Sequence, residues 1–272
     1  MCASRRRVRL ERRTERSMRA ALLILIALPP ALALPVARHV TLPAAEFSST
    51  LPQGEGRATV GIRTFQLDQY PVTNGEFLEF VRANPQWRRD RVARLFADPQ
   101  YLAHWQESAE LGAAARPLQP VTRVSWFAAK AYCESRGERL PTWYEWEYAA
   151  AASETVADAR GDPAWRQRIL DWYAQPSTAA LPEVARGPAN FYGVQDLHGL
   201  VWEWVLDYNA LLVSNDSREQ GGADRLQFCG EGALSAADRD NYAVLMRIAY
   251  LSALEARFTT ANLGFRCATG SL

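Results

Sequence analysis

Short apolar runs separated by turn residues predict a mixture of strands and helices along this chain. Residues 60–67 (VGIRTFQL) partly alternate between apolar and polar positions, which predicts a strand, and residues 121–124 predict a shorter one. The run VWEWV at 201–205 is rich in residues that favour strands. On such a strand Glu203 shares a face with two valines, so its carboxylate should meet a cation or a network of hydrogen-bond donors.

Capping residues mark where four helices should begin. The predicted N-caps are Thr73, Ser125, Thr142 and Asp162. The two threonines are each followed three residues later by a glutamate, which is the pattern of a capping box. The helix after Ser125 should end near Gly137.

Two later regions are less regular. Residues 153–189 are predicted to form an insertion or long loop around one helix, of the kind that serves as a lid or an interaction surface. Trp165 and Trp172 place aromatic side chains there, and aromatic residues are enriched at protein interfaces. Residues 233–254 are expected to be partly helical.

The first 38 residues read as a targeting segment. Arginines crowd residues 1–19, and residues 20–34 are almost wholly apolar, which is typical of a secretory signal peptide. Met1 and Met18 are both candidates for the true start. The alternative is a retained membrane anchor, although the apolar stretch is short for a span. We expect a periplasmic or secreted protein, with a linker at 39–57 and one domain at 58–272, and membrane association only if the leader stays uncleaved.

Composition and cysteine usage narrow the functional classes. A hydrophobic content of 48% indicates a packed protein, and a net charge of +1 gives no reason to expect a nucleic-acid partner. Outside the leader, the chain holds three cysteines: Cys133, Cys229 and Cys267. In an oxidising compartment this predicts one disulfide and one free thiol, with all three pairings open at this point.

Five segments in order carry a resemblance to a known family. They are YPVTNGEFLEFV, PVTRVSWFAAKAYC, RLPTWYEWEYAA, NFYGVQDLHGLVWEW and NLGFRCA. Together they resemble the sulfatase-modifying-factor family, which includes the formylglycine-generating enzymes, over roughly residues 58–270. The resemblance implies an α+β fold, a variant of the C-type-lectin fold with mixed short strands, capped helices and long loops.

The resemblance also implies a calcium site. Its ligands would be the side chains of Asp196 and Glu203 and the backbone carbonyls of Gly199 and Val201, all hard oxygen donors that suit Ca²⁺. The chain departs from the family at Leu200, where asparagine is usual. The alternative is a structural hydrogen-bond network around Glu203.

A second departure concerns catalysis. Formylglycine-generating members have two closely spaced cysteines shortly before the final NLGFRC segment, and these bind copper(I) as thiolates. Here no cysteine lies between Cys229 and Cys267, so copper is not expected and Cys229 is the one candidate catalytic residue. Because Cys267 matches the family's structural cysteine, the resemblance favours a Cys229–Cys267 disulfide, with Cys133 free or as the alternative partner.

Two functions compete on these residues. The favoured hypothesis is an exported non-oxidase that binds a protein or peptide partner, as a binding or maturation factor. The alternative is a metal-dependent oxidase, using copper or iron, that acts on cysteine or sulfur substrates in the formylglycine-generating manner. In that case Cys229 would share a metal with His198, Cys133 or Cys267. A three-histidine iron site is not expected, because His39 adjoins the leader and only two other histidines exist.

Overall fold

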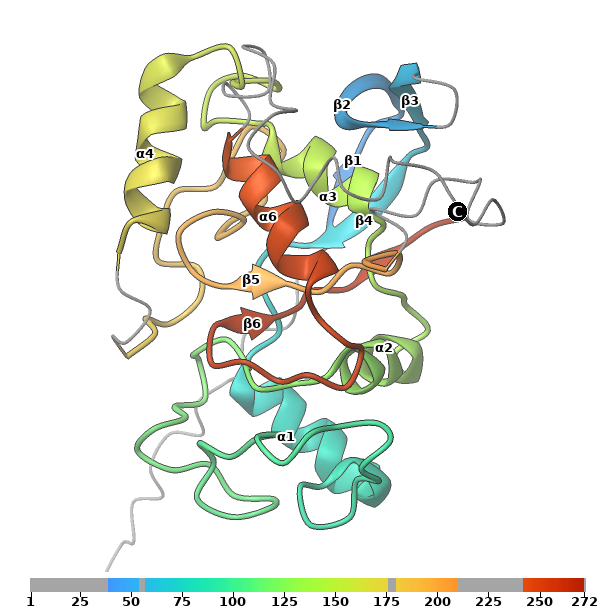
Figure 1. Ribbon diagram of the computed structural model, residues 1–272, viewed down its shortest axis with the longest axis vertical. Helices are drawn as coiled ribbons and strands as arrows, with labels where there is room; N and C mark the ends of the chain where they lie inside the picture. The colour runs from blue at the N-terminus through green and yellow to red at the C-terminus, as the bar shows by residue number, and fades with distance from the viewer. Residues whose placement is uncertain (1–38, 54–56, 176–179, 210–241, 272) are drawn as a thin grey trace, which may run out of the picture. The chain divides into compact units, whose positions relative to one another are not determined.

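The computed structural model describes residues 39–53, 57–175, 180–209 and 242–271 (Figure 1). The strands are β1 (His39–Leu42), β2 (Ala45–Gln53), β3 (Arg57–Ile62), β4 (Phe65–Asp68), β5 (Trp202–Glu203), β6 (Leu263–Gly264) and β7 (Ala268–Thr269). The helices are α1 (Asn74–Ala83), the 3₁₀ turn η1 (Pro85–Trp87), α2 (Trp126–Ser135), α3 (Trp143–Ala150), α4 (Pro163–Tyr173) and α6 (Tyr242–Ser252). No helix in these ranges is long and apolar enough to cross a membrane.

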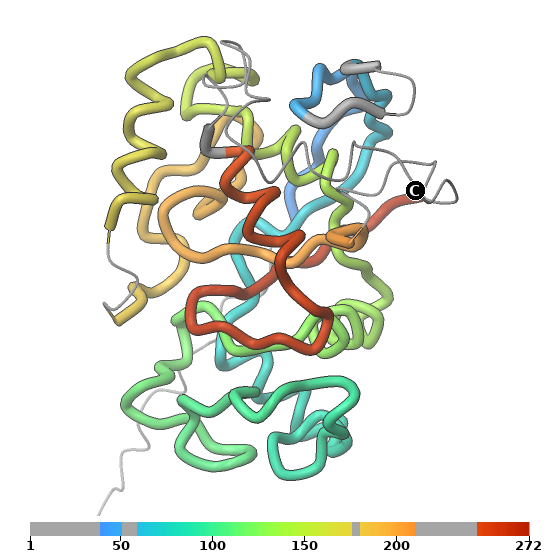
Figure 2. Tube along the Cα trace, viewed as in Figure 1, coloured from blue at the N-terminus to red at the C-terminus, as the bar shows by residue number. Residues whose placement is uncertain are grey.

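The strands form three small sheets. β4 is the middle strand of an antiparallel sheet in the order β1-β4-β7, so strands from both ends of the described chain pair with it. β2 and β3 form an antiparallel pair, and β5 and β6 form a short parallel pair in which Trp202 lies opposite Leu263. Figure 2 shows the segment around β5 and the C-terminal segment side by side.

The local structure differs from the expectation in three segments. The segment expected as a linker at 39–57 contains β1 and β2, both paired within the domain. The strand expected at 60–67 is two strands: β3 ends at Ile62 and pairs with β2, whereas β4 begins at Phe65 and belongs to the sheet with β1 and β7. Residues 121–124 form no strand: this segment gives its backbone hydrogen bonds to scattered partners, such as the one from the Val121 amide to the Val72 carbonyl.

The strand expected at 201–205 is present only as β5. The Trp204 amide still donates to the Gly264 carbonyl, but the Leu206 amide turns away to the Pro141 carbonyl, so regular pairing stops. Close backbone contact explains the glycine in the partner strand, because a Cβ on Gly264 would lie 2.6 Å from the Val121 carbonyl oxygen. The β5–β6 contact therefore holds two backbone segments tightly in the core.

The helix starts are confirmed. Thr73 and Thr142 each close a complete capping box with the glutamate three residues on. Ser125 and Asp162 accept from backbone amides at the starts of α2 and α4. Gly137 adopts a positive φ of 73° just after α2, as a helix-terminating glycine does. The predicted helix within 233–254 is α6.

Buried aromatic side chains fill the centre of the domain. Trp143 and Trp146 from α3 and Trp204 after β5 are each at most 2% exposed. In Figure 1, α6 lies between α3 and α4, and its Arg247 covers the Trp146 ring. This packing brings α3, α4, α6 and the segment before β5 together.

Candidate functional site

A cavity of about 200 Å³ opens where α4 meets the end of α3 and the segment before β5. Two tryptophans of α4, Trp165 and Trp172, form apolar parts of its wall. The lining residues are Ala150, Ala152, Ser153, Glu154, Trp165, Arg168, Ile169, Trp172, Pro188, Asn190, Val194, Asp196, Leu197, His198 and Gly199. Apolar walls with a few convergent polar groups are the usual features of a ligand pocket.

His198 supplies the most distinctive polar atom of the cavity. Its Nε2 lies 2.9 Å from the Ala150 carbonyl oxygen, so Nε2 carries the proton and Nδ1 is left as an acceptor. Nδ1 is buried and accepts no hydrogen bond from any described residue. The ring is held edge-on between Trp146 and Trp165, and burial lowers its pKa to about 4. His198 is therefore neutral at pH 7.

Charged groups at the cavity include an ion pair and a constrained aspartate. Arg168 lies 3.2 Å from Glu154, with both side chains substantially exposed. Asp196 adopts a positive φ of 61° and accepts a hydrogen bond from the Ala185 amide at 2.6 Å. Burial raises the pKa of the Asp196 carboxyl. The cavity thus offers both charges at its rim and a neutral acceptor, His198 Nδ1, inside.

Behind the cavity, the Glu203 carboxylate pairs with Arg266. A cation partner of this kind is one of the two kinds of contact that its position between two valines predicts. Arg266 donates to both of its carboxylate oxygens at 2.8 to 3.1 Å, and the Trp146 indole donates at 2.8 Å. Both charged side chains have 0% exposure. Arg266 also donates to the carbonyls of Asp68 and Gln195. These bonds connect β4 and the segment before β5 to the buried ion pair.

A second buried arginine covers this pair. The Arg247 guanidinium lies 3.5 Å from the centre of the Trp146 ring and donates to the Glu203 carbonyl at 2.6 Å. Burial lowers its pKa to about 10, so it remains charged at pH 7. Its Nε has no hydrogen-bond partner among the described residues. Such contact between a desolvated cation and an indole face is among the stronger cation–π interactions.

The inferred calcium ligands are only partly brought together. Asp196 and Gly199 line the cavity, whereas Val201 and Glu203 lie in the core. Both Glu203 oxygens already accept from Arg266, and a calcium ion bound to them would lie against a guanidinium. The Glu203 carboxylate therefore does not fit the inferred ligand set, and the alternative hydrogen-bond network describes its contacts. Calcium binding by Asp196 with the Gly199 and Val201 carbonyls stays a prediction.

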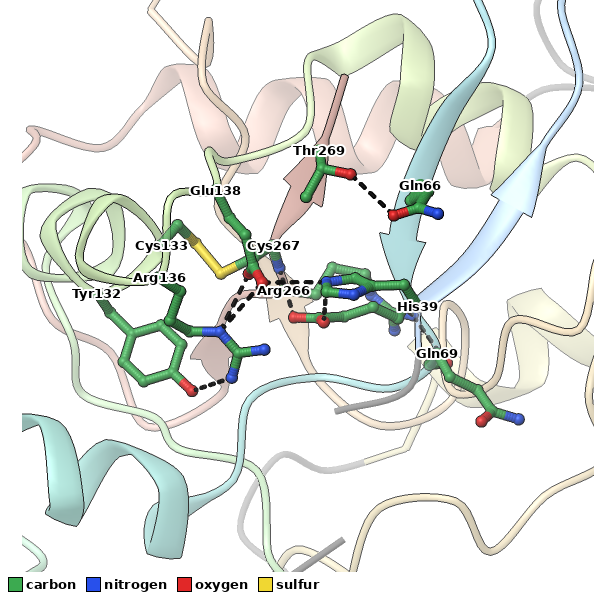
Figure 3. Close-up of polar contacts among 11 residues, drawn as sticks. His39, Gln66, Gln69, Tyr132, Cys133, Arg136, Glu138, Arg266, Cys267 and Thr269 are labelled. Carbon is green, nitrogen blue, oxygen red and sulfur yellow. Dashed lines mark hydrogen bonds and ion pairs between the residues drawn. A yellow bond between two sulfur atoms is a disulfide. The ribbon is translucent and has the colours of Figure 1, made fainter. Parts of the chain in front are cut away.

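The disulfide differs from the favoured pairing. Cys133 on α2 is bonded to Cys267 just before β7, with the two Cα atoms 5.6 Å apart (Figure 3). The expected Cys229–Cys267 pair is therefore replaced by the alternative one. Cys133 is a buried residue in the last turn of α2, and its sulfur lies beside the residue that precedes β7. Cys229 itself lies outside the described residues.

Other candidates separate into two groups. Trp165 and Trp172, expected on an interaction surface, lie in the cavity wall. His104, by contrast, lies away from the cavity with neither ring nitrogen hydrogen-bonded to a described residue. Sequence reasoning missed the roles of Arg247 and Arg266. The signal for Arg266 was available, since it belongs to the NLGFRCA segment and a buried Glu203 required a cation.

Comparisons with known proteins agree with the quoted motifs. A family model described as the sulfatase-modifying factor enzyme 1-like domain matches residues 27–270. The formylglycine-generating enzyme of Streptomyces coelicolor is 31% identical over 85% of this chain and 88% of its own length. A Bos taurus protein named inactive C-alpha-formylglycine-generating enzyme 2 is 30% identical with the same coverage. The crystal structure of CarF aligns at a TM-score of 0.45 and 14% identity over 86% of this chain and 98% of that one.

Proposed function

The chain belongs to the sulfatase-modifying factor enzyme 1-like domain family, and within it we propose an exported non-oxidase that binds a protein or peptide partner, as a binding or maturation factor. A relative named formylglycine-generating enzyme and one named as an inactive enzyme are about equally similar to it. Activity must therefore be argued from its own residues. The C-type-lectin variant of the fold is part of the same proposal.

The Cys133–Cys267 disulfide is the observation that carries this proposal. The sequence holds four cysteines: the disulfide uses two of them, and Cys2 lies in the expected leader. Cys229 then remains as one thiol. Copper(I) in this family would need two thiolates, and a soft-ligand site cannot be built from one.

The cavity supports the binding part of the proposal. Its volume suits one side chain of an extended partner, with Trp165 and Trp172 offering apolar contact. The buried Nδ1 of His198 can accept one hydrogen bond from that side chain. Arg168 and Glu154 at the rim can pair with charged neighbours. The expected occupant is a peptide side chain that is largely apolar but carries one hydrogen-bond donor.

An oxidation assay tests the proposal. The copper(I)-treated protein is incubated with O₂ and cysteine-containing peptides, and the products are examined by mass spectrometry for the aldehyde. The Streptomyces coelicolor formylglycine-generating enzyme serves as the positive control. We expect no aldehyde and no O₂ consumption by this chain. Aldehyde formation that disappears in Cys229→Ser would overturn the proposal.

The same disulfide reduces the number of residues that could share a metal with Cys229 in the oxidase alternative. Cys133 and Cys267 are bonded to each other, which removes both from the ligand sets considered for Cys229. His198 remains the candidate partner, because its Nδ1 is neutral and carries no hydrogen bond from the described residues. In this alternative, copper or iron binding would be lost in both Cys229→Ser and His198→Gln.

A further inference from the structure

We propose that His39, Asp68 and Glu138 form a binding site for a divalent transition ion of the zinc type. The three side chains come from β1, β4 and the turn after α2, away from the cavity lining. One ligand atom from each lies within 4.8 Å of the other two. Figure 3 shows His39 and Glu138 facing one another beside the disulfide.

The spacing of these atoms fits a shared ion. His39 Nε2 lies 3.2 Å from Asp68 Oδ1 and 3.2 Å from Glu138 Oε1. Zinc bonds to nitrogen and carboxylate oxygen are about 2.0–2.2 Å long, so two ligand atoms of a tetrahedral ion are roughly 3.3 Å apart. An imidazole nitrogen with two carboxylate oxygens suits zinc and similar ions better than calcium or copper(I).

Polar atoms of these three residues face one another with few partners outside the cluster. Asp68 is 1% exposed, and apart from the 3.2 Å contacts within this cluster neither its Oδ1 nor His39 Nε2 has a hydrogen-bond partner among the described residues. The other oxygen of Asp68 is occupied, since it accepts from the Cys267 amide at 2.9 Å. A buried carboxylate oxygen is costly unless a donor or cation meets it, and His39 would have to be protonated to donate. A bound cation would satisfy Asp68 and Glu138 with His39 neutral.

The backbone holds the three ligands in place before any ion binds. His39 and Asp68 are direct partners in the antiparallel register of β1 and β4. The Glu138 amide donates to the Cys133 carbonyl at 2.9 Å, and the next residue, Arg139, exchanges two backbone hydrogen bonds with Ala268. The ligands therefore belong to segments fixed by the sheet and the disulfide.

Local charge also favours a cation. Arg136 lies 3.2 Å from the Glu138 carboxylate and is held by the Tyr132 hydroxyl at 3.1 Å. It offsets one of the two carboxylate charges, so one negative charge is left to face the His39 imidazole. With three protein ligands, the ion would keep a position for water, and its binding would fasten β1 to β4 and to the turn after α2.

Zinc titration of the chain without its leader or any affinity tag tests the site. After chelator treatment and dialysis, calorimetry should show one zinc per chain, and zinc should raise the melting temperature. His39→Gln should weaken binding by more than about 100-fold, because even losing a residue that only supports a ligand costs 10- to 100-fold. Asp68→Asn, which keeps an oxygen for the Cys267 amide, should act alike with an unchanged circular dichroism spectrum.

Two control variants separate this site from other zinc ligands. His104→Gln removes a distant histidine and Cys229→Ser removes the remaining thiol, and both should bind zinc like the parent. Cobalt(II) in place of zinc should give a spectrum without a thiolate charge-transfer band. The proposal is overturned by non-stoichiometric binding, by unchanged affinity in His39→Gln, or by a thiolate band that disappears in Cys229→Ser.

Discussion

Arg266 donates hydrogen bonds from two nitrogens to the Glu203 carboxylate: Nε lies 2.9 Å from one oxygen and Nη2 lies 2.8 Å from the other. Neither side chain has any exposed surface. Because both charges are removed from water, each depends on the other. Removing one partner of a buried pair leaves an uncompensated charge, which is much more costly than losing an exposed pair.

Glu203→Ala should therefore lower the free energy of unfolding by about 3–5 kcal/mol. The matched control is Glu79→Ala, which breaks the exposed pair between Glu79 and Arg82 and should cost less than about 1 kcal/mol. Urea denaturation at pH 7 measures both. Equal losses in the two variants would contradict the role given to the buried pair.

The disulfide makes a prediction about both chemistry and stability. Mapping of peptides without reduction should find Cys133 joined to Cys267 and Cys229 alkylated. Cys133→Ser should cost about 2–5 kcal/mol, since the bond closes a long loop across a sequence separation of 134 residues. Cys229→Ser should leave the melting temperature nearly unchanged. An alkylated Cys133 in the folded parent would contradict the pairing.

His104 predicts a loss of stability in mild acid. Burial, with help from Arg123 and Arg89, lowers its pKa from 6.5 to about 4 in the folded state. Between these values the unfolded chain binds more protons than the folded chain, so stability falls as pH decreases through that window. His104→Gln should remove this contribution to the pH dependence. Between pH 7.5 and 5, the free energy of unfolding of the variant should fall by about 1–2 kcal/mol less than that of the parent. Urea denaturation of both proteins at pH 7.5 and pH 5 measures this difference. Equal losses of stability in the parent and the variant would contradict the prediction.

The cavity predicts which side chains a partner contacts. Peptides selected from a displayed random library for binding to this chain should bind Trp172→Ala at least about 10-fold more weakly, because large aromatic side chains commonly dominate interface energies. His198→Gln should also weaken them, since it changes the acceptor inside the cavity. Fluorescence anisotropy with labelled peptides measures both, and Glu79→Ala is the control. Selected peptides that bind all variants equally would place the binding surface elsewhere.

Local signals explain why some elements could be predicted from the sequence. The capping boxes at Thr73 and Thr142 are defined by residues three positions apart, so they need no knowledge of the rest of the fold. Glu203 required a cation because its neighbours on the strand are apolar, and that reasoning holds whichever residue supplies the charge. The ordered motifs then identified the family.

Non-local contacts explain what could not be predicted. The end of the strand at β5 depends on the Leu206 amide meeting the Pro141 carbonyl, which no local pattern encodes. The choice of Cys133 over Cys229 depends on how α2 lies against the last strand. Likewise, the sequence predicts a linker at His39, and only the pairing of β1 with β4 reveals its place beside Asp68.

Because β4 is the middle strand of its sheet, the domain cannot fold completely until the C-terminal segment has reached it. Arg266 reaches back to the Asp68 carbonyl across 198 residues, and the Cys267 amide reaches the Asp68 carboxylate across 199. Closing such long loops slows folding. Until this segment docks, β4 presents an unpaired edge on which another chain could assemble. The pairing of β4 is therefore complete only when residues from both ends of the described chain have come together.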